Sequence, residues 1–277
     1  MVPICDACWH ELPRNRESCC TRCGEDLFLP IFNLSVPESA LCRACRMAPP
    51  AFVRAVSFGV YEGSLRAAIH SLKYDGMAGL ARPLGKRLAE AIETLWREDV
   101  PSEMLVVPVP LHRSRARQRG FNQARVLAKE AMRSLRKGRA GRKLSLSSDA
   151  LVRQRSTENQ AGLTPRQRRL NLRGAFFVSD VETVRGRHIL LVDDILTTGA
   201  TVRACSQVLI EAGVASVRVA TLARAQRRTP RAFYEEVGYV NVPGKGSFVA
   251  IDGPAHTDYS PANNSRGVEL GQTSVFM

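Results

Sequence analysis

Two adjacent carboxylates at the end of an apolar run are the strongest chemical signal in the sequence. The segment HILLVDDILTTGAT spans residues 188–201, and Asp193 and Asp194 close its apolar half. Carboxylates at the carboxyl end of a parallel strand face the crevice in which open α/β sheets bind ligands. Both acids are therefore candidates to hold the hydroxyl groups of a sugar, directly or through a divalent cation.

The small-residue turn that follows the acids has the composition of a phosphate cradle. It offers free backbone N–H groups, a glycine for close approach, hydroxyl groups, and the positive end of a helix dipole. A carboxylate pair beside such a turn predicts a sugar-phosphate site. The residues of the turn are Leu196, Thr197, Thr198, Gly199, Ala200 and Thr201.

The cysteines form three C-x-x-C pairs, a spacing that favours metal binding over disulfides in a reducing compartment. Two pairs separated by 18 residues supply the four thiolates of a structural, tetrahedral zinc site. We expect the ligands to be Cys20, Cys23, Cys42 and Cys45, in a zinc ribbon. Cys5 and Cys8 are an alternative partner for the Cys20/Cys23 pair.

The composition excludes several classes of protein. The chain has 277 residues, 44% of them hydrophobic and 24% charged, with a formal net charge of +14. No apolar run approaches the roughly 18 residues of a membrane span, and residues 1–20 lack the pattern of a signal peptide. We therefore expect a globular cytoplasmic protein with no membrane span.

Basic charge is concentrated in residues 112–173, which hold 18 Lys or Arg against three acidic residues. Such a block suits a polyanion, either a nucleic acid or a phosphorylated small molecule. An exposed helical face with its arginines in solvent is the alternative. His70, His112 and His188 stand singly in the sequence, and we expect structural roles for them.

Apolar periodicity predicts the order of the elements. Residues 65–72 and 80–95 have helical spacing, as do 121–135 and 200–212, and residues 104–109, 189–192 and 214–222 have the composition of strands. Strands that alternate with helices predict an α/β fold with a mostly parallel sheet. Residues 137–148 are expected to be a mobile basic excursion from it.

Three domains follow from these shifts in composition. Residues 1–50 are the expected cysteine-rich zinc ribbon, and 51–224 the α/β domain. Residues 225–277 lack sustained periodicity and become polar toward the end, which predicts a poorly ordered C-terminal extension.

The acidic motif resembles the phosphoribosyl-diphosphate (PRPP) binding motif of type I phosphoribosyltransferases. Over residues 5–224 the chain further resembles the ComF, or GntX-like, competence family. The similarity rests on the cysteine pairs, the acidic motif and three further segments, in the same order. These segments are YEGSLRAAIHSLKY (61–74), VVPVPLHRSRARQRGFNQA (106–124) and RSTENQAGLTPRQRRLNLRGAF (155–176).

The resemblance implies a role for each matching residue. Asp193 and Asp194 would hold the ribose hydroxyls, directly or through Mg²⁺, and the turn 196–201 would hold the 5′-phosphate. The second segment would bind diphosphate, and its candidates are Pro108, Arg119, Asn122 and Gln123. Residues 155–176 would form a hood that closes on PRPP, with Gln160 toward the diphosphate.

Two functions therefore stand side by side. One is phosphoribosyl transfer, a pentosyl transfer reaction, from PRPP to an unidentified nitrogen acceptor. The other is single-stranded DNA binding or uptake by the same fold without turnover, with a protein of the competence machinery as partner. The acidic motif supports the first, and the basic block with the zinc ribbon supports the second.

Overall fold

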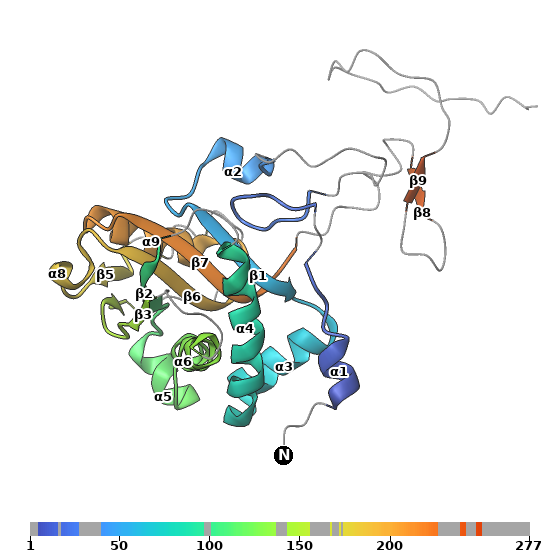
Figure 1. Ribbon diagram of the computed structural model, residues 1–277, viewed down its shortest axis with the longest axis horizontal. Coiled ribbons are helices and arrows are strands. Elements are labelled where there is room, and N and C mark those ends of the chain that lie inside the picture. The colour runs from blue at the N-terminus through green and yellow to red at the C-terminus, as the bar shows by residue number, and fades with distance from the viewer. Residues whose placement is uncertain are drawn as a thin grey trace, which may run out of the picture. The chain divides into compact units, whose positions relative to one another are not determined.

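A five-stranded parallel sheet organises the larger part of the structure (Figure 1). Its strand order is β1-β7-β6-β2-β3, and each neighbouring pair is parallel. The central strand β6 pairs with β7 on one side and β2 on the other, so its carboxyl end lies in the middle of one sheet edge. The strands are β1 (Arg54–Val60), β2 (Glu103–Pro108), β3 (Lys143–Leu146), β6 (His188–Leu196) and β7 (Ser216–Arg224).

The computed structural model describes residues 5–15, 18–27, 40–96, 101–136, 143–155, 167, 172, 174–226, 239–241 and 248–250. They belong to two units, Met1–Arg227 and Arg228–Met277. The sheet and all of the described helices lie in the first unit. In the second, β8 (Tyr239–Asn241) and β9 (Phe248–Ala250) pair as an antiparallel ribbon.

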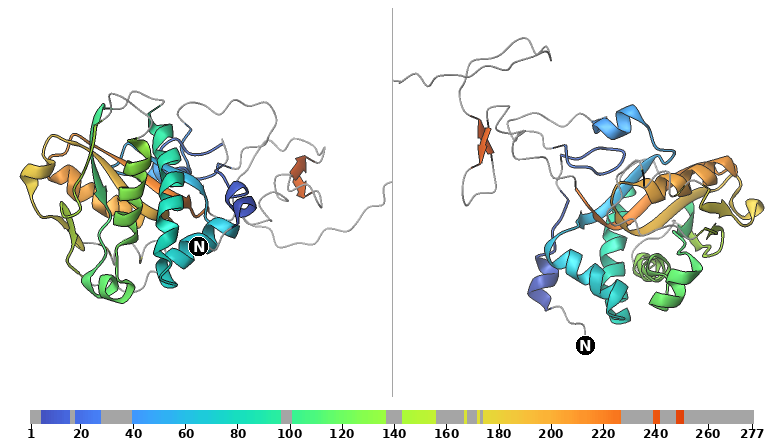
Figure 2. Two further views of the ribbon diagram at one scale, coloured as in Figure 1. Left: turned by 60° about the horizontal axis from the view of Figure 1, so that its bottom comes forward. Right: turned by 180° about the vertical axis from the view of Figure 1, so that it is seen from behind.

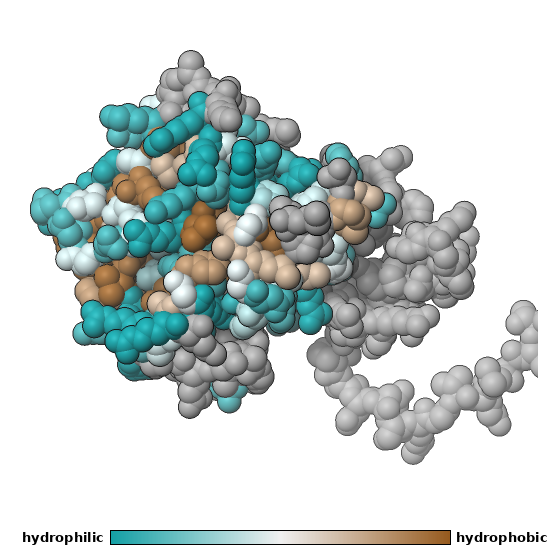
Figure 3. Space-filling model, turned by 90° about the horizontal axis from the view of Figure 1, so that it is seen from below, coloured by the Kyte–Doolittle hydropathy of each residue, from teal (hydrophilic) through white to brown (hydrophobic). Residues whose placement is uncertain are grey.

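Helices cover one face of the sheet in an amphipathic layer (Figure 2). Their buried leucines and alanines recur at three to four residues and pack against the apolar side chains of β6 and β7. The side of the molecule seen from below presents hydrophilic residues with apolar ones between them (Figure 3). The layer contains α3 (Gly63–Tyr74), a 3-10 turn η1 (Ala78–Leu80), α4 (Ala81–Leu95) and α6 (Gln123–Leu135).

The opposite face has a second core. There α9 (Ala200–Glu211) packs with the antiparallel pair β4 (Leu151–Arg153) and β5 (Phe176–Val178). Three cysteines from the N-terminal region, Cys20, Cys23 and Cys45, are buried in this core together with Cys205 of α9. Leu12 instead lies in the first core. The N-terminal residues thus contribute to both layers of the first unit.

The described part of this unit also contains short helices outside these two layers. Among them are α1 (Asp6–His10), α2 (Arg43–Met47) and α8 (Val181–Val184). A further helix, α5 (Arg113–Arg119), precedes α6, and Gly120 with a φ of 77° separates the two. Left-handed backbone of this kind favours glycine, so the chain can turn sharply between them.

The α/β prediction is confirmed, and the predicted strands and helices appear near their expected bounds. The difference lies within residues 137–148, which the sequence predicts to be a mobile excursion from the sheet; residues 137–142 fall outside the described residues. Residues Lys143–Leu146 form the edge strand β3 and pair in parallel with β2. The alternation in Lys-Leu-Ser-Leu suits an edge strand, and basic residues around it mask that signal in composition. Within the described residues, no helix is both long and apolar enough to cross a membrane.

Candidate functional site

The two acids occupy the carboxyl end of β6 and belong to opposite faces of the sheet, because successive side chains of a strand alternate. Asp194 faces the helical layer, where its Oδ2 lies 2.9 Å from Nζ of Lys73 on α3. The side chains of this pair are only 12% and 14% exposed. Burial would lower the pKa of Lys73, but the attraction of Asp194, with smaller effects of Asp193 and Tyr61, raises it above its ordinary value.

Asp193 lies on the other face, within the electrostatic reach of Arg153 on β4 and Cys205 on α9. Its Oδ1 accepts a hydrogen bond from the backbone N–H of Asp194 at 2.9 Å. Burial, followed by repulsion from Asp194, raises the pKa of Asp193 to about 7. The two neighbouring acids are thus held in different charge environments.

The turn after β6 leaves its amides open on one side. Gly199 has a φ of 77° and caps the N-terminus of α9. Among the described residues, the N–H groups of Thr197, Thr198 and Gly199 donate to no protein acceptor, and only Ala200 N–H contacts the Thr198 hydroxyl, at 3.4 Å. The first turn of any α-helix adds further free donors. The predicted cradle can therefore receive an anion.

A buried arginine holds the carbonyl side of the same turn. Nη1 of Arg224 donates to the carbonyl oxygen of Leu196 at 2.8 Å and to that of Thr197. Arg224 contacts only the carbonyl oxygens of the turn, so it leaves the backbone N–H groups of the turn unbound. Thr197 is exposed, Thr198, Gly199 and Thr201 are half-buried, and Leu196 and Ala200 are buried.

The predicted diphosphate residues meet beside the end of β2, at Pro108, whose strand neighbour is Val192 of β6. Asn122 caps α6 by accepting from Arg125 N–H at 3.3 Å, and its amide donates to Val109 O at 3.1 Å. Both bonds fix the loop between β2 and α6, so the structure gives Asn122 a positioning contact.

Gln123 and Arg119 are joined to each other. Gln123 is 1% exposed, and its Oε1 accepts from Nη1 of Arg119 at 3.3 Å. The other terminal nitrogen of Arg119 donates to the hydroxyl of Tyr74 at 3.1 Å, and the guanidinium lies 5.0 Å from the centre of that ring. Gln160 falls outside the described residues.

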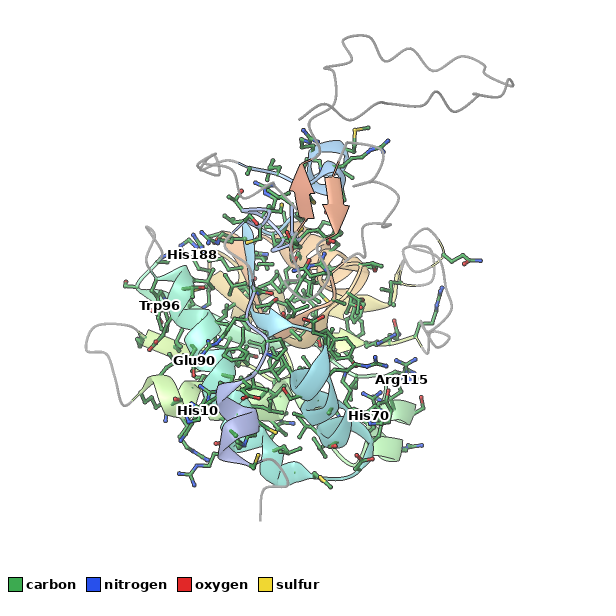
Figure 4. The ribbon with its side chains drawn as sticks, turned by 90° about the vertical axis from the view of Figure 1, so that its right-hand side faces the viewer. His10, His70, Glu90, Trp96, Arg115 and His188 are labelled. Atoms are coloured by element: carbon green, nitrogen blue, oxygen red, sulfur yellow. The ribbon has the colours of Figure 1, made fainter. Side chains whose placement is uncertain are left out.

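The three histidines singled out from the sequence each contact another side chain or backbone group. His188, the first residue of β6, is 2.9 Å from the hydroxyl of Ser216, the first residue of β7, and His112 caps α5 by accepting from the backbone N–H of Ser114. The ring of His70 packs against Tyr74. Figure 4 shows His188 and His70 on different sides of the molecule, and His188 begins β6, whereas the two acids lie near the carboxyl end of that strand.

The four expected cysteines form one cluster, as predicted. The sulfur atoms of Cys20, Cys23, Cys42 and Cys45 all lie within 4.8 Å of one another. The Cys23 and Cys42 sulfurs are 3.7 Å apart. Tetrahedral zinc with Zn–S bonds of about 2.3 Å needs about 3.8 Å between its sulfurs. The donor set and its spacing therefore fit a structural zinc ion, which would fix the two knuckles.

The thiols of this cluster compete for protons, as expected of a set of metal ligands. Hydrogen bonding from Cys23 lowers the pKa of Cys20, and hydrogen bonding to Cys20 raises that of Cys45. The alternative ligands Cys5 and Cys8 are not in the cluster. They contact each other at the start of α1, and Cys5 is exposed.

Sequence reasoning missed the residues that hold the site from other elements. Lys73 lies inside a segment quoted for its family resemblance, and its only local signal is a lysine that follows the buried residue Leu72. Arg224 and Arg153 are basic residues at the ends of apolar strand segments. A buried charge at a strand end signals that a partner exists, but the partner itself depends on the fold.

Comparison with known proteins places the chain in a family. The family model "Phosphoribosyl transferase domain" matches residues 121–257. The DNA utilization protein YhgH of Escherichia coli strain K12 is 33% identical over 224 residues, which are 80% of this chain and 90% of that protein. Competence protein F of Haemophilus influenzae is 30% identical over 186 residues, 66% of this chain and 78% of that one. The chain belongs to the ComF family.

Other members are more distant. Competence protein ComFC of Bacillus subtilis is 26% identical over 231 residues, which are 80% of this chain and 84% of that protein.

Among solved structures, hypoxanthine-guanine phosphoribosyltransferase of Schistosoma mansoni in complex with IMP aligns at 17% identity with a TM-score of 0.33. That alignment covers 53% of this chain and 56% of the other.

Metal content should separate the two cysteine assignments. We expect about one zinc ion per chain, because one complete tetrad exists among the described residues. Changing Cys20 and Cys42 to Ser should remove the ion, and changing Cys5 and Cys8 to Ser should leave it. Native mass spectrometry of the three proteins measures this directly. Zinc loss from the Cys5/Cys8 variant would refute the assignment.

The raised pKa of Asp193 predicts a pH-dependent stability. The unfolded carboxyl has a pKa near 3.9 and the folded one about 7, so its contribution is complete below about pH 4 and is lost as the pH rises through 7. The variant Asp193→Asn cannot lose stability in this way, because its amide does not titrate. Its unfolding free energy should exceed that of the wild-type protein by roughly 2–4 kcal/mol at pH 8 and by less at pH 5. Urea unfolding at both pH values tests this, and an equal gain at both would contradict it.

Lys73 and Asp194 should behave as a coupled pair. Lys73→Met leaves the Asp194 carboxylate buried without its cation and should destabilise the fold by about 3–5 kcal/mol. The double variant Lys73→Met/Asp194→Asn should recover most of this loss, since no uncompensated charge remains. A double-mutant cycle of urea unfolding measures the coupling. Additive losses would show that the pair contributes nothing as a pair.

Proposed function

We propose that the chain binds PRPP, or a closely related sugar phosphate, at the carboxyl ends of β6 and β2. One juxtaposition carries the proposal: the acidic pair directly precedes a turn whose amides are open and whose carbonyls are held from behind. Carboxylates suit ribose hydroxyls and the open amides suit a 5′-phosphate. The family model, which covers this turn, supports the same ligand.

The electrostatics of the site suit a pentose that carries anionic groups. Lys73 already neutralises Asp194, so binding does not require a second cation at that acid. On the other face, burial lowers the pKa of Arg153, and the positive charge of Arg115 lowers it further, so the two guanidinium groups repel each other. Such a pair would gain from a phosphate or diphosphate placed between them.

The reaction that this site would support is substitution at the anomeric carbon. A bond forms between that carbon and a nitrogen of the acceptor, the bond to diphosphate breaks, and diphosphate leaves with its electron pair. Bound Mg²⁺ would neutralise the charge that develops on the leaving group. The chain itself would orient the ribose through Asp193 and Asp194 and hold the phosphate at residues 197–201, which lowers the barrier by positioning.

Calorimetric titration with PRPP tests the proposal. At pH 8, where Asp193 is mostly charged, we expect saturable binding that falls by about tenfold or more in Asp193→Asn, since a ribose contact to a charged acceptor is lost. Glu182→Gln is a matched control, because Glu182 is an acid on α8 with a 76% exposed side chain. Unchanged affinity in Asp193→Asn would exclude the assigned site. Diphosphate release, measured with a panel of nitrogen bases, then distinguishes transfer from binding alone.

Single-stranded DNA is the second candidate ligand. Arg113 and Arg117 of α5 are exposed. Tyr74 is 60% exposed, and the guanidinium group of Arg119 lies 5.0 Å from the centre of its ring, so an aromatic side chain and a positive charge are adjacent on this surface. Relatives are named for DNA utilization and competence, which supports this candidate and a partner in such a machinery.

Salt dependence distinguishes this second candidate. If α5 neutralises DNA phosphates, affinity for an oligo-dT should fall steeply with salt, with a slope of about −0.7 per phosphate contacted. The double variant Arg113→Ala/Arg117→Ala should reduce the magnitude of the salt slope by about 1.4, because two phosphate contacts are lost. Tyr74→Ala should weaken DNA binding and leave the salt slope unchanged, because stacking does not depend on salt in this way. Fluorescence anisotropy measures both. A flat slope in the wild-type protein would remove DNA as a ligand of this surface.

A further inference from the structure

Arg224 lies between the cysteine cluster and the phosphate turn. It is the last residue of β7 and pairs in register with Leu196, the last residue of β6. The residue is 3% exposed. A guanidinium group this deeply buried is stable only when its donors are used, so its partners define its role.

The donors of Arg224 divide between two structures. Nη1 donates to the carbonyl oxygens of the phosphate turn, Leu196 and Thr197, and to Ala225 at 2.9 Å. Nε donates to the carbonyl oxygen of Cys23 at 3.2 Å, and Nη2 forms a buried ion pair with Glu25. A single planar group thus joins the first cysteine knuckle to the backbone of the turn.

A second arginine repeats the connection from the helix that begins at the turn. Nη1 of Arg203 in α9 donates to Ala48 O at 2.7 Å, just after the second knuckle, and Nη2 lies 3.9 Å from the sulfur of Cys45. One pocket is lined both by the cysteines Cys23, Cys42 and Cys45 and by Thr198 and Gly199 of the turn. The metal ligands therefore lie directly behind the phosphate cradle.

The charge of a metal-filled cysteine cluster would attract the two arginines. A zinc ion with four thiolate ligands has a net charge of −2, and the guanidinium groups of Arg203 and Arg224 lie beside it, with the charge of Arg224 shared with its ion-pair partner Glu25. With the ion in place, Arg203 and Arg224 would keep their contacts to the two knuckles, and the backbone N–H groups of the turn would stay free. Without it, the knuckle that presents Cys23 O and Glu25 loses its cross-link, and Arg224 loses the partners that fix its position.

We infer that Arg224 is a positioning residue that couples metal occupancy of the cysteine cluster to the shape of the phosphate turn. Filling the cluster with metal raises the affinity of the turn for a sugar phosphate. This inference rests on the proposed function, because it concerns the same turn. Coupling between two ligands is reciprocal, so the sugar phosphate must also stabilise the bound metal by the same factor.

The test measures both directions of this coupling with the zinc-loaded full chain. In the wild-type protein, zinc removal by a chelator should weaken PRPP binding by about tenfold, and saturating PRPP should strengthen zinc retention by a matching factor. In Arg224→Met, whose four cysteines are intact, zinc should still bind while PRPP affinity falls and both coupling effects disappear. Arg185→Met, an exposed arginine on α8, is the matched control and should keep both effects.

A cobalt-loaded sample adds a readout that a merely structural role would not change. PRPP should alter the thiolate-to-cobalt absorption bands of the wild-type protein and leave those of Arg224→Met unchanged. Arg224→Lys restores the charge without the planar set of donors and should regain little coupling. If Arg224→Met does not fold, as judged by circular dichroism, Glu25→Gln serves in its place because it weakens the same junction from the knuckle side.

The outcomes separate this inference from the proposed function. Wild-type protein that binds PRPP equally with and without zinc would overturn the coupling and leave the sugar-phosphate site intact. Zinc-loaded wild-type protein that binds neither PRPP nor inorganic phosphate would overturn both. Coupling that persists at full size in Arg224→Met would show that the metal acts through other contacts, which overturns the role of Arg224.

Discussion

The end of the central strand β6 must accommodate two carboxylates in a sheet that is covered on both faces. Alternation along a strand sends Asp193 and Asp194 to different faces, so one partner cannot neutralise both. On the helical side, Lys73 forms an ion pair with Asp194. On the other side, Asp193 is within the electrostatic reach of Arg153.

The same constraint explains why the two acids are not equivalent. Asp194 is held in an ion pair and is mostly buried, which suits a residue that keeps its position. Asp193 has a pKa raised to about 7 by burial and by its neighbour, so it destabilises the folded state when charged. A fold that retains such an acid sacrifices stability at this position, as proteins commonly do at their functional sites.

The phosphate turn depends on support from outside the sheet. Its carbonyl groups are bound by Arg224, which is bound in turn by the cysteine knuckle, so the ribbon is part of the architecture of the site. This arrangement gives the four-cysteine cluster a reason to be buried in the second core rather than exposed on a separate module. The turn after β6 and the four-cysteine cluster are therefore adjacent parts of one unit of this ComF-family chain.

The features that can be predicted from the amino-acid sequence are those whose residues are neighbours along the chain. The strand, acidic pair and turn lie within residues 188–201, and each cysteine knuckle needs only a C-x-x-C, so periodicity and spacing predicted the α/β class, the turn and the tetrad. Local composition also misled, because the basic residues around Lys143–Leu146 hid an edge strand. Tertiary structure alone decided which charges meet. Lys73 of α3 pairs with Asp194 of β6, and Arg224 pairs with Glu25, 199 residues away. Such partners have no fixed spacing, since they depend on how the strands are ordered and on what each face buries.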